Sequence, residues 1–194
     1  MLRRAFARLD VSSRSFFAIV DRGSCFGGLL LELALAADRT YMLALPEEEG
    51  DAPKLAVDAF NFNLLPEVNG RSRLETRFCG DREKVPAIEK KSGQTLTSEQ
   101  AVELGLITVA PDELDWEDEI RVAIEERVSL SPDALTGMEA SLRFPGLESL
   151  ETKVFARLSA WQNWVFIRPN ATGERGALKL FGSGSKSKFD WERV

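Results

Sequence analysis

The feature that most constrains this chain is an apolar strand that leads directly into a glycine-rich turn and then a helix. Residues 16–20 are continuously apolar, the turn contains Gly27 and Gly28, and an apolar helical pattern follows over 27–37. Glycine lets the backbone approach a ligand closely, and the first turn of a helix has N–H groups without intrahelical acceptors. Such a junction favours a developing negative charge. Within the apolar helical run, Glu32 is the one carboxylate.

Composition excludes several kinds of chemistry. The chain has 194 residues, enough for one core or a core with an appended module, and it has no histidine. Ser-His-Asp and Cys-His nucleophile systems and most catalytic zinc sites are therefore excluded, and we expect neither a metal nor a cofactor. The net charge of −6 argues against nucleic-acid binding. Two cysteines are too few for a disulfide framework, and no targeting or membrane-spanning segment is evident, so we expect a cytoplasmic protein.

The first two thirds of the chain alternate between strand and helix patterns. A hydroxyl residue, Thr97, precedes one short helix, and Gly105 closes it, which are the usual start and stop signals. Strands are expected at 40–45, 55–62 and 106–109, and helices at 72–78 and 97–105. Residues 1–14 are polar and charged, and no helix or strand is predicted there. The alternation predicts an α/β fold built of βα units.

The remainder reads as helical. Helices are expected over 115–129, from Ser131-Pro132 onward, and over 148–167, and a Gly/Ser/Lys-rich tail follows. We therefore divide the chain into a core, residues 1–130, and a helical module with a flexible tail, residues 131–194. The last long helix carries an apolar stripe that is wider than one buried face, so packing and an intersubunit contact are both open. Its residues are Leu150, Val154, Phe155, Leu158, Trp161, Trp164, Val165 and Phe166.

Two motifs resemble the crotonase (enoyl-CoA hydratase/isomerase) superfamily. One is the glycine-to-aspartate run over 27–38, and the other is the capped helix at 97–105 followed by Leu106-Ile107. The resemblance implies a partial crotonase-like ββα spiral followed by a C-terminal helical module. In that family the first motif forms half of an oxyanion hole for an acyl-CoA thioester, and it also supplies a catalytic glutamate. The resemblance therefore implies that Gly28 and Leu29 stand at the oxyanion position and that Glu32 stands at the position of the glutamate.

The chain also departs from the family pattern. Leu29 replaces the middle glycine of the motif, Ala59 stands where many hydratases have a second glutamate, and Asp58 is adjacent but displaced. Glu32 is therefore either a general acid/base or, as we favour, a structural glutamate in a filled-in former site. Cys25 is either a thiol activated near a helix start or, as we favour, a small buried residue.

Further segments resemble the benzoyl-CoA-dihydrodiol lyases, also called 2,3-epoxybenzoyl-CoA dihydrolases, a double-length and divergent branch of the superfamily. They are residues 12–15, 23–26, 31–39, 130–140, 159–164 and the tail over 182–191. The resemblance is to the C-terminal half of these enzymes, whose catalytic glutamates lie in the other half, so it implies no catalytic residue here. It implies a scaffold and homodimer contact for a lyase that acts on a CoA thioester, with the N-terminal half as partner. The alternative is a small stand-alone acyl-CoA enzyme that uses Glu32.

Overall fold

The computed structural model describes residues 1–143 and 145–193. Internal contacts divide the chain into two compact units. The first unit contains Met1–Val11 and Ser15–Ala123, and the second contains Ser12–Arg14 and Ile124–Val194. The expected division at residue 130, with a degenerate core before it and a dimerisation module after it, stays a prediction.

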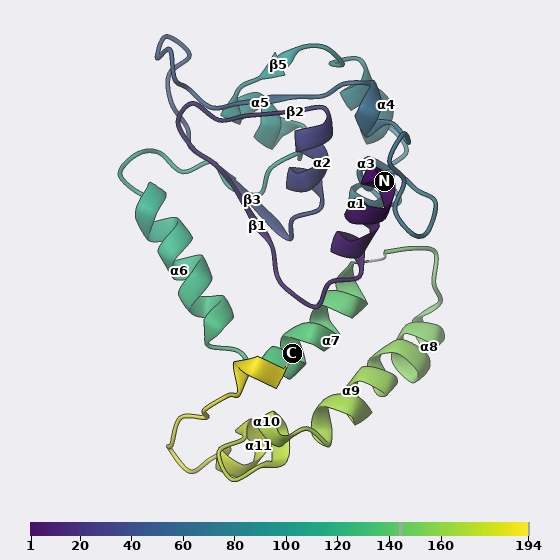
Figure 1. Ribbon diagram of the computed structural model, residues 1–194, viewed down its shortest axis with the longest axis vertical. Coiled ribbons are helices and arrows are strands. Elements are labelled where there is room, and N and C mark those ends of the chain that lie inside the picture. The colour runs from purple at the N-terminus through teal and green to yellow at the C-terminus, as the bar shows by residue number, and fades with distance from the viewer. Residues whose placement is uncertain (144, 194) are drawn as a thin grey trace. The chain divides into compact units, whose positions relative to one another are not determined.

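The strands of the first unit form two small sheets. Parallel strands β1 (Phe17–Val20) and β3 (Arg39–Met42) form one sheet. In the other sheet, β4 (Lys54–Ala56) lies between β2 (Cys25–Gly27), which is parallel to it, and β5 (Thr95–Leu96), which is antiparallel. Figure 1 labels β2 and β5 of this sheet. The predicted α/β architecture is confirmed.

Strand β1 pairs with β3 along one of its edges. β1 and β3 pair residue for residue, starting with Phe17 opposite Arg39, and the Leu43 N–H donates to the Val20 carbonyl at 3.1 Å. Because peptide groups alternate in direction along a strand, those of Ile19 point toward the opposite edge of β1. Among the described residues no strand pairs with that edge.

The helices of the first unit begin and end largely where the sequence provides caps. Ser72 and Thr97 each accept a hydrogen bond from the third helical residue and form capping boxes with Glu75 and Gln100. Gly105 has a φ of 72°, the left-handed conformation expected after a helix. The helices are α1 (Leu2–Asp10), α2 (Leu29–Leu35), the short η1 (Ala59–Asn61), α3 (Arg73–Arg77), α4 (Lys84–Glu89), α5 (Ser98–Glu103) and α6 (Trp116–Val128), whose last residues belong to the second unit.

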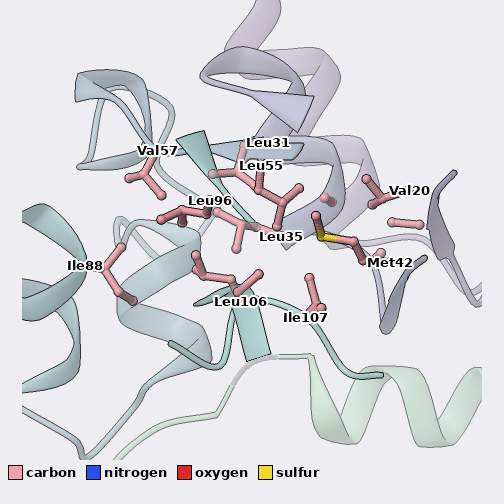
Figure 2. Packing of buried hydrophobic residues seen from close by; sticks show 14 of the residues in the cluster. Val20, Leu31, Leu35, Met42, Leu55, Val57, Ile88, Leu96, Leu106 and Ile107 are labelled. Carbon is pink, nitrogen blue, oxygen red and sulfur yellow. The ribbon is translucent and has the colours of Figure 1, made fainter. Parts of the chain in front are cut away.

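The first unit buries one main apolar core and one smaller cluster. Figure 2 shows the core, in which residues from both sheets meet residues from the helices: Val20, Leu31, Leu35, Met42, Leu55, Val57, Ile88, Leu96, Leu106 and Ile107. On the other face of β1, Phe17 and Ile19 pack against Tyr41 and Trp116 in the smaller cluster. Both faces of β1 are therefore covered, as expected for a strand without polar residues.

The second unit is helical. A six-residue π-helix is inserted between α8 and α9, and the Ser159 hydroxyl donates to the Val154 carbonyl, five residues back. The wider turn shifts the phase of the side chains, so the stripe expected at four-residue spacing is not one continuous row. The elements are α7 (Pro132–Leu142), α8 (Leu150–Thr152), the π-helix η2 (Lys153–Leu158), α9 (Ser159–Phe166), α10 (Pro169–Thr172), α11 (Ala177–Leu180) and η3 (Trp191–Arg193).

Polar side chains occupy the interior of the second unit. Asp133 is fully buried and accepts from Arg168 Nε and from Asn170 Nδ2, each at 2.9 Å. Asn170 Oδ1 also accepts from the Asp190 N–H at 2.8 Å, which holds the end of the tail against α10. Asn170 begins a glycosylation sequence pattern, but its side chain is buried and fully bonded in the folded chain.

Four expectations from the sequence are corrected. Residues 2–10 form helix α1 rather than an irregular polar segment. The strand expected at 55–62 ends at Ala56, and the strand expected at 106–109 is reduced to an isolated bridge between Val109 and Tyr41. Cys25 is exposed rather than buried, because it lies in β2 at the rim of its sheet.

Candidate functional site

The glycine turn places Glu32 in the first turn of α2. Gly28 precedes this helix with a φ of 49°, and a β-carbon there would lie 2.4 Å from Asp58 Oδ2. The positive φ favours glycine at this position, and any larger side chain would also have to displace the Asp58 carboxylate. The Gly28 N–H donates to the Ala56 carbonyl at 3.2 Å, whereas the structure gives the Leu29 N–H no acceptor among the described residues. Of the two expected oxyanion donors, Leu29 therefore has the N–H that is available, and the oxyanion role of both stays a prediction.

Glu32 is a buried and fully paired carboxylate. Only 1% of its surface is exposed. Oε1 accepts from Asn61 Nδ2 at 2.8 Å, and Oε2 accepts from Arg73 Nη1 at 2.8 Å. Asn61 Nδ2 also donates to the Gly28 carbonyl at 2.9 Å, which ties the carboxylate to the turn before α2. Both oxygens of Glu32 are thus paired with neighbouring donors, and its structural role stays a prediction.

Arg73 connects Glu32 to helix α1. Its Nη2 lies 2.6 Å from Asp10 Oδ1 and 3.4 Å from the Phe6 carbonyl, and its Nη1 also donates to the Leu65 carbonyl at 3.1 Å. The guanidinium carbon lies 5.3 Å from the centre of the Phe6 ring, within the range of a cation–π contact. The Arg73 side chain is 1% exposed, and those of Asp10 and Glu32 are 2% exposed. One guanidinium thus stands between two buried carboxylates.

The second catalytic carboxylate of the hydratase pattern has no counterpart beside Glu32. Ala59 begins the short helix η1, and Asp58 caps that helix by accepting from the Phe60 N–H at 2.7 Å. Asn61 fills the space next to Glu32 instead. Sequence reasoning did not identify Asp10, Asn61 or Arg73. The available signal was an arginine that follows a helix-capping serine, but its partners lie far away along the chain.

Glu67 is a further buried carboxylate in this unit. Its Oε2 accepts from the Thr76 hydroxyl and from Asn69 Nδ2. Burial, which disfavours the charged form, raises the pKa of Glu67 above its ordinary value of 4.5, and the nearby Asp10 carboxylate acts in the same direction.

The cavities of the first unit lie elsewhere. A cavity of about 220 Å³ opens between the segment after β3 and the start of α5, and its walls include Leu43, Leu45, Leu96 and Ser98. Gly28, Leu29 and Glu32 do not line it. In the part of the chain that is described, no three His, Cys, Asp or Glu side chains are arranged to hold a metal ion. Nor is any of the described helices long and apolar enough to cross a membrane.

Solved structures with the same arrangement of elements are enoyl-CoA hydratase/isomerases. The enzyme from Cupriavidus metallidurans CH34 superposes with a TM-score of 0.68 at 22% identity, covering 96% of this chain and 64% of that one. An enoyl-CoA hydratase from Geobacillus kaustophilus HTA426 gives a TM-score of 0.67 at 18% identity, covering 100% of this chain and 67% of that one. The fold is that of the crotonases. At these identities the likeness shows the fold alone.

A sequence relative is much more similar. The chain is 57% identical over all 194 residues to a benzoyl-CoA-dihydrodiol lyase from Aromatoleum evansii, and the match covers the C-terminal 34% of that protein. The resemblance predicted from the sequence motifs is therefore confirmed. The chain spans about a third of the length of this relative. No family model matches the chain.

Proposed function

We propose that this crotonase-fold chain is the C-terminal scaffold part of a lyase that opens the ring of 2,3-epoxybenzoyl-CoA with release of formate, in aerobic benzoate degradation in the cytoplasm. Its partners in this role are the N-terminal part of the same enzyme and a second copy, which it contacts through the C-terminal helices. The relative's name, together with 57% identity over the whole chain, supports the substrate class.

One observation carries the scaffold role. Glu32, the residue at the catalytic position of the crotonase motif, has both carboxylate oxygens engaged and 1% of its surface exposed. A general acid or base must reach the proton that it transfers within hydrogen-bond distance. Because Glu32 is buried with both oxygens paired, a thioester substrate has no free carboxylate oxygen to meet there. Among the described residues, the other carboxylate of this network is Asp10, which is itself buried and paired with Arg73. The acid–base residues of the lyase reaction would then come from the N-terminal part.

A chimeric enzyme tests this proposal. The matching C-terminal third of the Aromatoleum evansii lyase is replaced by this chain, and turnover of 2,3-epoxybenzoyl-CoA and formate release are measured. We expect the chimera to be active, the relative lacking its C-terminal third to be inactive, and the isolated chain to be inactive toward both this substrate and crotonyl-CoA. An isolated chain that hydrates crotonyl-CoA and loses this activity on Glu32→Gln would instead support the stand-alone acyl-CoA enzyme.

A further inference from the structure

Helix α1 is attached to the first unit by very few buried side chains. Along its nine residues only Phe6 and Asp10 are buried. Arg4 and Arg8 are exposed and lie about half a turn away from Phe6, so the opposite face of the helix is basic. By contrast, α2 buries Leu31, Ala34 and Leu35 in the main core. The attachment of α1 therefore depends on an aromatic ring and a carboxylate rather than on an apolar stripe.

Both of these side chains meet the same guanidinium. Arg73 Nη2 donates to the Phe6 carbonyl and to Asp10 Oδ1, and the guanidinium lies over the Phe6 ring. Figure 1 shows α1 beside α3, the helix that carries Arg73. From its other side Arg73 donates to Glu32 Oε2. The residue that holds α1 in place is thus the residue that occupies Glu32.

The docked state of α1 is incompletely satisfied. Asp10 Oδ2 and Arg73 Nε are buried without a hydrogen-bond partner. A buried polar atom without a partner retains its desolvation cost, and a buried ion pair often gains little over that cost. Elements with few buried apolar contacts open locally before the whole domain unfolds. These features mark α1 as an element that can undock locally while the main core stays folded.

We propose that α1 is a separable cover held by Arg73, and that the Glu32 carboxylate becomes accessible to solvent and to small molecules only when α1 undocks. This inference does not depend on the proposed lyase function. It concerns a conformational change within the first unit, in which Asp10 and Phe6 leave Arg73 while the main core stays folded.

Hydrogen exchange of the unaltered full chain, followed at increasing low concentrations of urea, tests the undocking. We expect the amides of 6–10 to exchange through an opening that exposes little surface, seen as a weak dependence on urea. The amides of β3 should exchange through global unfolding, with a steep dependence. If the α1 amides show the same rate and the same steep dependence as the β3 amides, α1 is an integral part of the core and the proposal is wrong.

Carboxyl labelling with a carbodiimide and glycine ethyl ester tests the link to Glu32. We expect Asp10→Asn and Phe6→Ala each to raise labelling of Glu32 by about tenfold. Asp10→Asn weakens one charge-assisted hydrogen bond to Arg73, and Phe6→Ala removes the cation–π contact with the same guanidinium. The Asp118→Asn variant, changed at an exposed pair with Arg121 on α6, is the matched control and should leave Glu32 labelling unchanged. Faster exchange of α1 in both variants without any gain in Glu32 labelling would overturn the covering role.

Discussion

Arg73 Nη1 lies 2.8 Å from Glu32 Oε2, although the two residues are 41 positions apart in the chain. The pair is almost completely shielded from water, and Asp10 shares the same guanidinium. In the interior, breaking such a network at one residue leaves an uncompensated charge, whereas replacing all of its charges together can be nearly neutral. The network therefore makes a sharp prediction about which substitutions the fold tolerates.

Arg73→Met should be severely destabilising. It leaves the Glu32 and Asp10 carboxylates buried without their cation, and the expected loss in free energy of unfolding is about 3–5 kcal/mol. Urea denaturation at neutral pH measures this loss. As a control, Arg121→Gln removes an exposed ion pair with Asp118 and should cost less than about 1 kcal/mol.

The charge-neutral triple variant Arg73→Met, Glu32→Gln and Asp10→Asn should recover most of the stability lost in Arg73→Met. If the triple variant is as unstable as the single variant, then packing of the arginine side chain, and not its charge, is what matters.

A second prediction concerns Glu67 and pH. Its raised pKa means that the protonated form is favoured in the folded state. The stabilising contribution of Glu67 is therefore complete below the ordinary pKa of 4.5, and it is lost as the pH rises through the higher folded-state pKa. Glu67→Gln cannot ionise, so its stability relative to the unaltered chain should increase between about pH 4 and about pH 8.

Thermal or urea unfolding at both pH values measures this difference. The exposed Glu103→Gln serves as the matched control, for which we expect a difference that changes little with pH. A Glu67→Gln variant whose relative stability falls as the pH rises would show that Glu67 is held as a stabilising anion.

Local signals in the sequence predicted the parts of the fold that depend on neighbouring residues. The helix after Gly28 and the capped helix after Thr97 are both present, because the signals that start them, a glycine turn and a capping threonine, lie within one turn of the helix start. The buried strand β1 follows in the same way from an uninterrupted apolar run.

Partners distant in the chain could not be predicted. Asp10 and Arg73 are 63 positions apart, and nothing near either residue indicates the other. For the same reason α1 was missed, since its buried face includes an aspartate that reads as polar surface. The π-helix at Lys153–Leu158 was missed because its side chains match ordinary α-helical spacing in the sequence. The candidate site was thus located from the motif, but the partners of Glu32 required the structure.

The second unit carries the third prediction, which is self-association. Among the described residues of this unit, the buried apolar side chains are Pro132, Leu135 and Ala171, whereas Leu150, Phe155 and Leu158 on the last long helical segment are more than half exposed. Exposed aromatic and aliphatic residues of this kind commonly anchor protein interfaces. We expect the chain to form dimers or larger species at micromolar concentration, as measured by sedimentation velocity.

Phe155→Ser should weaken this association by at least about tenfold, because Phe155 is 78% exposed on the π-helix. Val122→Ser, at an exposed apolar position on α6 in the first unit, is the control and should leave association unchanged. A chain that sediments as a monomer at these concentrations would contradict the prediction.

The last prediction concerns the edge of β1 that β3 does not cover. The Val20 backbone is engaged with β3, whereas the peptide groups of Ile19 point toward the other edge, along which none of the described strands lies. An open edge next to an apolar strand favours pairing with a further strand. We expect the Ile19 amide to exchange much faster than the Val20 amide in this chain. Fusing the preceding part of the Aromatoleum evansii lyase ahead of Met1 should slow exchange of the Ile19 amide at least about tenfold and raise the melting temperature. The Val20 amide should still exchange more slowly than the Ile19 amide in the fused chain. Because Val20 is measured in the same spectra, it controls for a change in global stability. Slow exchange at Ile19 in the unfused chain, with no gain on fusion, would mean that the first unit is complete without a preceding strand.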